Sequence, residues 1–96
     1  MINNIISQLS LGPMNLRATI AVHGGAGSLG YFVNEEHRRK YLSGLVNAVN
    51  AGLEAARRGN ALDMVVEAVT SMELDGSYDA GRGSVLNLYG EVEQDA

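Results

Sequence analysis

The chain has 96 residues, which is enough for one small domain and leaves little room for a second. Its net charge of −4, from 7 basic and 11 acidic residues, argues against nucleic acid or an anionic membrane as a partner, because either would need a clustered basic face. The absence of cysteine excludes a disulfide framework, a thiolate zinc site and a cysteine nucleophile, and it makes the cytoplasm the default location.

Residues 1–15 are expected to be a leader that lies outside the folded part and need not be ordered. The first 11 residues contain no basic segment, and polar residues interrupt their apolar ones. This pattern fits neither a secretory signal nor a membrane span. We therefore place the folded portion at residues 16–96.

Residues 16–22 form a short run rich in β-branched and apolar side chains, and two glycines follow it closely. The pattern predicts a largely buried strand. The next residues, His23-Gly24-Gly25-Ala26-Gly27, predict a tight loop. Glycine there permits a positive φ and a close approach of the backbone to a ligand.

A long helix is predicted to begin after Asn34, whose side chain is suited to an N-cap and which two glutamates follow. Apolar residues at helical spacing form a wide stripe, which predicts that the helix lies against a sheet. Arg57 and Arg58 are expected in its last turn, and Gly59 is expected to end it in the left-handed conformation.

A second helix is predicted directly afterwards, with Asn60 as N-cap and Asp63 as the acid of a capping box. The very short connection predicts that the two helices pack side by side, antiparallel or steeply crossed. The residues expected to form the buried face of the second helix are Leu62, Val65, Val66, Val69 and Met72.

Residues 75–83 contain three glycines and predict a loop whose carbonyl groups are largely free of regular pairing. Free carbonyls in a tight loop can bind a cation. Residues 84–88 and 91–95 are then expected to be two short strands of a β-hairpin around Tyr89-Gly90.

Residues 25–30 have the spacing G-x-G-x-x-G of dinucleotide-binding loops. Such a site needs its helix to begin inside the motif and a strand to follow that helix. Here the helix begins later, at Asn34, and another helix follows. A phosphate loop of the G-x-x-x-x-G-K-[ST] type fails because Tyr31 stands where lysine is required. Nucleotide binding is therefore our least favoured hypothesis.

Four segments, in order, resemble one known family: residues 20–27, 60–63, 78–87 and 90–96. Together they are similar to the plant-type L-asparaginases and isoaspartyl aminopeptidases, which are N-terminal nucleophile (Ntn) hydrolases and are grouped with glycosylasparaginase and taspase. The resemblance implies an α/β (α+β) fold, namely the N-terminal part of a four-layer αββα sandwich. Residues 16–96 would supply a strand, two helices and a β-hairpin, as the N-terminal portion of the α-subunit.

The resemblance also implies a reaction. Enzymes of this family are made as precursors that cleave themselves and free a threonine as the N-terminus of a β-subunit. The threonine hydroxyl attacks an amide carbonyl, and its own α-amine handles the proton. The implied substrates are L-asparagine and β-aspartyl (isoaspartyl) peptides. A taspase-like protease and a non-catalytic scaffold or assembly fragment are the alternatives.

The nucleophile is not in this chain. The only threonines are Thr19 and Thr70, each inside a predicted element and outside the family's cleavage-site context. The chain alone is therefore expected to be inactive, and its partners would be the remainder of the α-subunit and the β-subunit, in a dimer of αβ units. Exposed sheet edges predict that the isolated chain is unfolded or aggregated.

The resemblance assigns pocket-supporting roles to His23, Gly24, Gly25 and Asp79. For His23 we prefer a hydrogen bond behind the loop to a catalytic role, because the threonine amine is the family's base. Asp79 stands where the family commonly has asparagine. Its carboxylate would raise the pKa of the threonine amine or change the potential that an anionic substrate meets.

The resemblance further implies a structural sodium ion in the second glycine-rich loop, and no organic cofactor. Main-chain carbonyl oxygens are suitable ligands for a hard cation. An ordinary connecting loop with water in that place is the alternative. The residues that would supply the carbonyls are Met72, Glu73, Asp75, Tyr78, Ala80 and Arg82.

Overall fold

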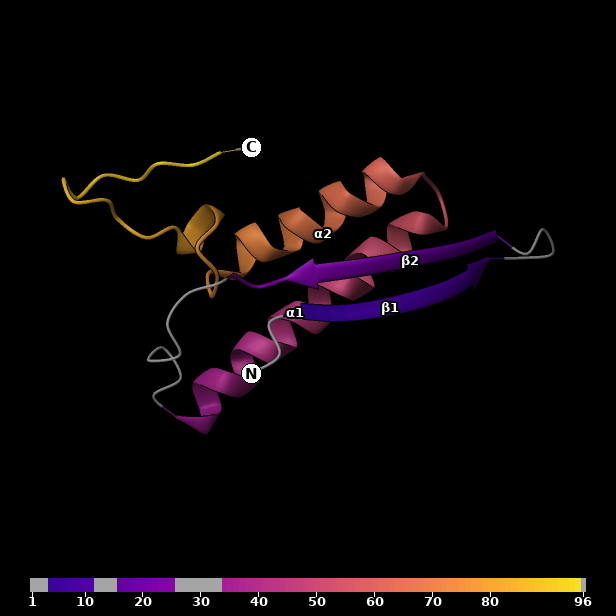
Figure 1. The fold of residues 1–96 in the computed structure, drawn as a ribbon, viewed down its shortest axis with the longest axis horizontal. Helices are drawn as coiled ribbons and strands as arrows, with labels where there is room; N and C mark the ends of the chain where they lie inside the picture. Colours follow the sequence, from indigo (N-terminus) through magenta and orange to yellow (C-terminus); the bar gives the residue numbers. More distant parts are fainter. Residues whose placement is uncertain (1–3, 12–15, 26–33, 96) are drawn as a thin grey trace.

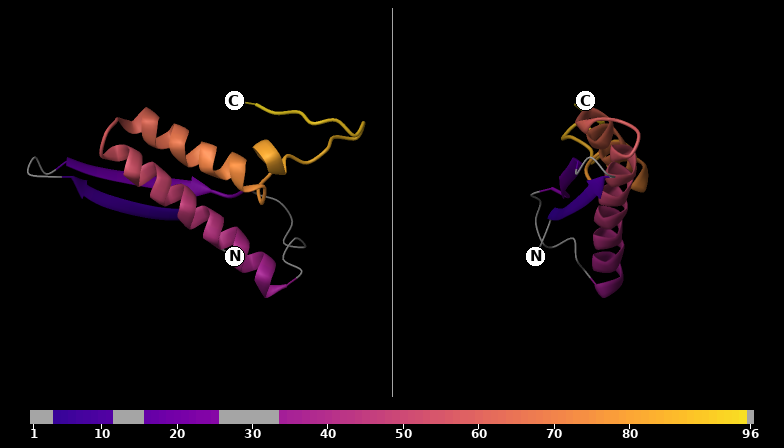
Figure 2. Two further views of the ribbon diagram at one scale, coloured as in Figure 1. Left: turned by 180° about the vertical axis from the view of Figure 1, so that it is seen from behind. Right: turned by 90° about the vertical axis from the view of Figure 1, so that its right-hand side faces the viewer.

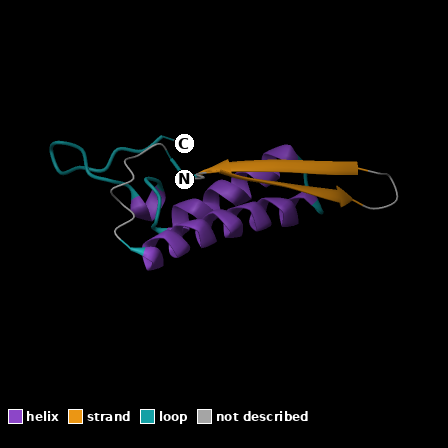
Figure 3. Cartoon of the chain, turned by 60° about the horizontal axis from the view of Figure 1, so that its bottom comes forward, coloured by secondary structure: helices purple, strands orange, loops and turns teal. Residues whose placement is uncertain are grey.

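A computed structural model describes residues 4–11, 16–25 and 34–95 (Figure 1). Two strands, β1 (Asn4–Leu11) and β2 (Leu16–His23), precede two helices, α1 (Glu35–Ala56) and α2 (Ala61–Asp75), and a short 3-10 turn, η2 (Gly81–Gly83). The strands lie together on one side of the helix pair (Figures 2 and 3). The strand and the two helices confirm the expected mixed α/β character.

β1 is a strand that the sequence did not predict. It pairs with β2 in antiparallel register over its whole length, from Asn4 opposite His23 to Leu11 opposite Leu16. The expected leader of residues 1–15 thus contains a regular element. The apolar residues of this segment are interrupted by polar ones, and such interruption is also a feature of a strand with one apolar face. Whether the segment is dispensable stays a prediction.

β2 agrees with the predicted strand, although only one of its faces is buried. Ile20 and Val22 are buried, whereas Thr19 and Ala21 between and beside them are exposed. Side chains alternate across a strand, so the buried pair faces the helices and the other pair faces away. The prediction of a largely buried strand is therefore wrong for one face, because no second layer covers it within the described residues.

α1 begins as predicted. The Oδ1 atom of Asn34 accepts a hydrogen bond from the backbone N–H of His37 at 2.9 Å. The helix ends at Ala56, earlier than predicted, with Arg57 as a right-handed C-cap residue at φ −70°. The predicted left-handed conformation of Gly59 is wrong, since Gly59 is not among the glycines with positive φ.

The connection between the helices explains Gly59. A Cβ atom at Gly59 would collide with the side chain of Asp63. That side chain accepts the backbone N–H of Asn60 at 3.0 Å, and Asn60 in turn accepts the N–H groups of Leu62 and Asp63. The predicted capping box is thus confirmed. Glycine is needed here for space, not for its conformation.

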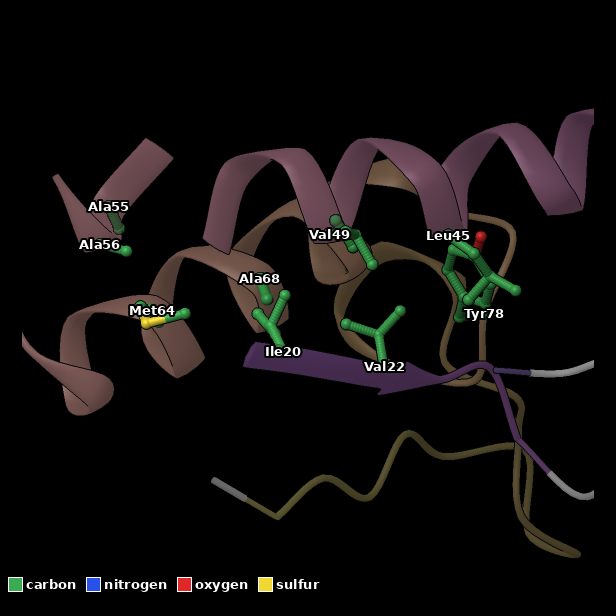
Figure 4. Close-up of a cluster of buried hydrophobic side chains, with 10 residues drawn as sticks. Ile20, Val22, Leu45, Val49, Ala55, Ala56, Met64, Ala68 and Tyr78 are labelled. Carbon is green, nitrogen blue, oxygen red and sulfur yellow. The ribbon is translucent and has the colours of Figure 1, made fainter. Parts of the chain in front are cut away.

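The core lies where α1 meets β2 and α2, and Figure 4 shows its side chains. Leu45, Ala48 and Ala55 of α1 are fully buried. At Gly52 an added Cβ would collide with Ile20 and lie 3.1 Å from the carbonyl oxygen of Met64. This glycine therefore allows the two helices and the strand to approach closely at one point.

α2 buries a different face from the predicted one. Its buried residues are Met64 and Ala68, and Met72 is half-buried. The prediction failed because α2 is apolar around much of its circumference, and α1 covers only one side of it. The predicted face is exposed to between 46% and 69%, at Leu62, Val65, Val66 and Val69. We call these four residues the outer face of α2.

The C-terminal segment forms less sheet than predicted. A single antiparallel bridge joins Leu86 and Val92, and Gly90 turns the chain with φ 77°. The turn at Tyr89-Gly90 is confirmed, whereas the two strands of residues 84–88 and 91–95 are absent. Leu88 is fully exposed, which shows that this segment has no layer to pack against within the described residues.

Candidate functional site

The end of β2 leads into a turn, residues 23–25, that we call the His-Gly-Gly turn. The Nδ1 atom of the exposed His23 ring accepts a hydrogen bond from the backbone N–H of Gly25 at 3.0 Å. Gly25 has φ 121°, a region that favours glycine. A hydrogen bond of this structural kind, rather than a catalytic role, is what we preferred for His23. The rest of this glycine-rich stretch, and of the G-x-G-x-x-G motif, lies outside the described residues.

Gly24 lies against Tyr41 of α1. A Cβ atom at Gly24 would collide with the Tyr41 hydroxyl and would lie 2.7 Å from the ring carbon Cζ. The Tyr41 phenol thus occupies the space that a side chain at residue 24 would need. The position of the end of β2 therefore depends on contact with the first turns of α1 as well as on pairing with β1.

Tyr41 also contacts Tyr78, which lies after α2. The two ring centroids are 4.8 Å apart with the planes tilted by 55°, a favourable geometry for aromatic rings. The hydroxyl of Tyr78 donates a hydrogen bond to the carbonyl oxygen of Tyr41. Burial raises the pKa of both phenols, and the negative charge of Asp75 raises that of Tyr78 further. Both rings are therefore neutral at physiological pH.

Gly44 makes room for this arrangement. It lies one turn after Tyr41 in α1, and a Cβ atom there would collide with the Tyr78 hydroxyl and lie 2.9 Å from Oδ2 of Asp75. Tyr78 itself is 3% exposed, and Figure 4 shows its ring beside Leu45, beneath α1. Gly44 thus lets the phenol of Tyr78 reach the backbone of α1.

The loop after α2 folds back on the end of that helix. Gly76 ends α2 with φ 84°, and the N–H of Ser77 donates to Oδ1 of Asp75 at 3.1 Å. Added Cβ atoms at Gly81 and Gly83 would each meet main-chain oxygens, that of Glu73 at 2.5 Å and that of Gly76 at 2.7 Å. The two glycines therefore allow a close approach of the loop to these carbonyls.

The predicted cation ligands are only partly free of backbone pairing. The carbonyl of Tyr78 accepts the N–H of Ala80 at 2.8 Å, and that of Ala80 accepts the N–H of Gly83 at 3.0 Å. A carbonyl oxygen has two lone pairs, so these bonds leave room for a cation. Across residues 4–11, 16–25 and 34–95, no group of three or more His, Cys, Asp or Glu side chains could hold a metal. Met72, Glu73 and Asp75 lie within α2, and the other three named donors follow it, so a cation held by these main-chain oxygens stays a prediction.

Asp79 ties the loop to the following segment. Its Oδ1 atom accepts the N–H of Val85 at 2.9 Å, and the side chain is exposed. The side-chain amide of Gln94 adds bonds to the carbonyl of Gly81 and to Oγ of Ser84. An asparagine at residue 79 could accept the same bond, which means that this role does not require the charge. Its expected influence on a threonine amine stays a prediction.

Some of the predicted site residues are linked through shared contacts, and others are not. Gly24 is linked to Tyr78 through Tyr41, whereas the carboxylate of Asp79 bonds to Val85. Sequence reasoning missed Tyr41 and Gly44 as part of this site. A glycine inside a helix costs about 1 kcal/mol relative to alanine, so Gly44 carried a signal that some neighbour needs the space.

Comparison with known proteins identifies the family. The family model described as Asparaginase matches residues 16–96. This chain belongs to the asparaginase family. It is 48% identical over 79 residues to the plant-type L-asparaginase of Thermococcus kodakarensis, a match that covers 82% of the chain and 25% of the relative.

Two further members of the asparaginase family show similar identity. The plant-type L-asparaginase of Pyrobaculum calidifontis is 49% identical over 78 residues, covering 81% of the chain and 25% of the relative. The isoaspartyl peptidase/L-asparaginase of Danio rerio is 45% identical over 78 residues, covering 80% and 24%. The chain spans about a quarter of the length of these curated relatives. No solved structure matches.

Proposed function

We propose that this chain is the N-terminal part of a threonine-dependent amidohydrolase that acts on L-asparagine, on β-aspartyl (isoaspartyl) peptides, or on both. One observation carries the proposal, namely 45–49% identity over 80–82% of the chain to proteins named for these two activities. The two names describe related reactions, since both substrates present an amide on the side-chain carbonyl of aspartate.

The proposal requires a nucleophile from outside residues 1–96. Thr19 lies within β2 and Thr70 within α2, and both are exposed. Neither can become a chain terminus without cutting a regular element. We infer that a longer chain releases its threonine by self-cleavage, after which the threonine hydroxyl attacks the amide and its α-amine takes the proton.

The contribution of this chain would be one wall of the pocket. The His-Gly-Gly turn offers backbone without side chains at Gly24 and Gly25, so that a nucleophile and substrate can approach it closely. The Nδ1 atom of His23 accepts a hydrogen bond from the backbone N–H of Gly25. This supports a positioning role for the ring, and it leaves proton transfer to the threonine amine.

Exposed apolar surface supports further chain as the partner. The outer face of α2 is exposed at Leu62 to 69% and at Val65 to 55%, while the outward face of β2 has no covering layer among the described residues. An exposed apolar face such as the outer face of α2 marks an interaction site. The outward face of β2, with Thr19 and Ala21, is exposed without being an apolar patch. The remainder of the α-subunit and the β-subunit of an αββα sandwich would cover both, with αβ units forming a dimer.

Sodium in the loop after α2 belongs to the same proposal. Of the carbonyls named for it, three belong to the last turn of α2 and three to the loop that folds back on that helix, and oxygen ligands suit a hard cation. Replacing sodium by tetramethylammonium at equal ionic strength is expected to lower the thermal midpoint of the full-length protein, meaning a chain of the relatives' length that contains residues 1–96. An unchanged midpoint would favour the ordinary loop with water.

The experiment that tests the function compares the full-length protein with the isolated 96 residues. Ammonia release from L-asparagine and hydrolysis of a β-aspartyl dipeptide are measured, and denaturing electrophoresis follows self-cleavage. We expect two bands and hydrolysis from the full-length protein and neither from the isolated chain. A single band without hydrolysis would support the scaffold alternative, whereas cleavage of a protein substrate alone would support the taspase-like one.

A further inference from the structure

We propose that Tyr41 is a positioning residue that holds the His-Gly-Gly turn in place by linking it to Tyr78 and the end of α2. The inference rests on the proposed function for its kinetic consequences, because it concerns the wall of the proposed pocket. It assigns Tyr41 no contact with substrate. Its role is to keep the backbone of Gly24 at a fixed position relative to the nucleophile and substrate that bind beside it.

The His-Gly-Gly turn needs such a support. Gly24 and Gly25 have no side chains to anchor them, and glycine has more backbone freedom than any other residue. The bond from Gly25 N–H to His23 Nδ1 fixes the turn locally. The Tyr41 phenol stands where a Cβ atom at Gly24 would be, so it supports the turn from the side of α1.

Tyr41 is itself held firmly enough to act as a support. Its ring packs on that of Tyr78 with a centroid distance of 4.8 Å, and its carbonyl accepts the Tyr78 hydroxyl. Tyr78 is 3% exposed and sits in space that Gly44 leaves open. Movement of the loop after α2 would therefore displace Tyr78, then Tyr41, and then Gly24.

The test is a double-mutant cycle in the full-length protein with Gly24→Ala, Tyr41→Leu and the pair. Gly24→Ala should lower kcat by about 10- to 100-fold, because misplacing a group by about 1 Å can cost that much. Tyr41→Leu should lower kcat more than it changes KM. In the Tyr41→Leu background Gly24→Ala should cost at least several-fold less, since the atoms that it collides with are gone.

Two controls separate positioning from general damage. Tyr41→Phe keeps the ring packing and the backbone carbonyl, so it should retain most of the kcat lost in Tyr41→Leu. Tyr89→Leu removes a tyrosine that is 87% exposed and should leave kcat unchanged. If Gly24→Ala costs the same factor in both backgrounds, or if only the thermal midpoint shows coupling, the proposal is overturned.

A second readout keeps the proposal independent of the proposed activity. In protein labelled with ¹⁵N-glycine, Tyr41→Leu should shift or broaden the amide resonances of Gly24 and Gly25, and Tyr89→Leu should leave them in place. Unmoved resonances would overturn the proposal even in an active enzyme. Moved resonances in a protein that hydrolyses neither substrate would support the link while refuting the proposed function.

Discussion

The two helices look alike in the sequence and differ sharply in the structure. Each begins at an asparagine N-cap, and each was predicted to bury an apolar face. α1 buries seven residues, while α2 buries two. α1 packs against both β2 and α2, whereas α2 contacts α1 on one side and leaves its outer face open. An apolar pattern therefore shows what a helix can bury, and its neighbours decide what it does bury.

The largest expected effect comes from a charge on the outer face of α2. Val66→Lys should make the isolated chain more soluble, because it interrupts exposed apolar surface. In the full-length protein the same change should lower the free energy of unfolding by about 3–5 kcal/mol, since an unpaired charge would be buried. Solubility and denaturant unfolding measure the two effects.

The matched control for that charge is Asn50→Lys, at an exposed polar position of α1. It should change neither solubility nor stability substantially. If Val66→Lys were as harmless as the control in the full-length protein, the outer face would be solvent-exposed there too, and the proposed covering partner would be wrong.

The buried face of α1 should give the next largest effect. Leu45 is 0% exposed, so Leu45→Ala should cost about 3 kcal/mol of unfolding free energy through lost burial and a cavity. Asn50→Ala on the exposed side of the same helix should stay within about 0.5 kcal/mol. Denaturant unfolding of the full-length protein compares them, and equal costs would contradict the core described here.

Gly44→Ala tests how α1 accommodates the end of α2. Alanine normally stabilises a helix relative to glycine, but here its Cβ would collide with Tyr78 and approach Asp75, so we expect a net loss of about 1–3 kcal/mol. Tyr78→Phe in the same protein should recover part of the loss, because it removes the colliding hydroxyl. A stabilising Gly44→Ala would mean that the two segments are not in contact.

The smallest effect at neutral pH concerns the tyrosine pair. The raised pKa of Tyr78 means that folding favours the neutral phenol, so its contribution to stability is complete below pH 10 and is lost as the pH rises above that. The unfolding free energy of Tyr78→Phe should therefore fall less steeply above pH 10. Absorbance at the tyrosinate band should show one fewer late-titrating group, and an identical titration of both proteins would contradict the burial.

Local signals in the sequence were sufficient for the caps and for part of the site. The Asn34 and Asn60 caps and the Asp63 capping box depend on residues within one helical turn, and all three are observed. The hydrogen bond from Gly25 N–H to His23 Nδ1 also spans only two residues, although no partner for His23 was named from the sequence. Tyr41, by contrast, could not be assigned to the site, because its contacts with Gly24 and Tyr78 join segments far apart in the chain.

By itself the sequence determined the family, the order of β2, α1 and α2, and where the helices begin, since side-chain chemistry and spacing act locally. Only the tertiary structure decided which apolar face of α2 is buried, that β1 pairs with β2, and why Gly24, Gly44, Gly52 and Gly59 are glycines. Those outcomes depend on which surfaces come together, and the space between two surfaces is set by neither sequence segment alone.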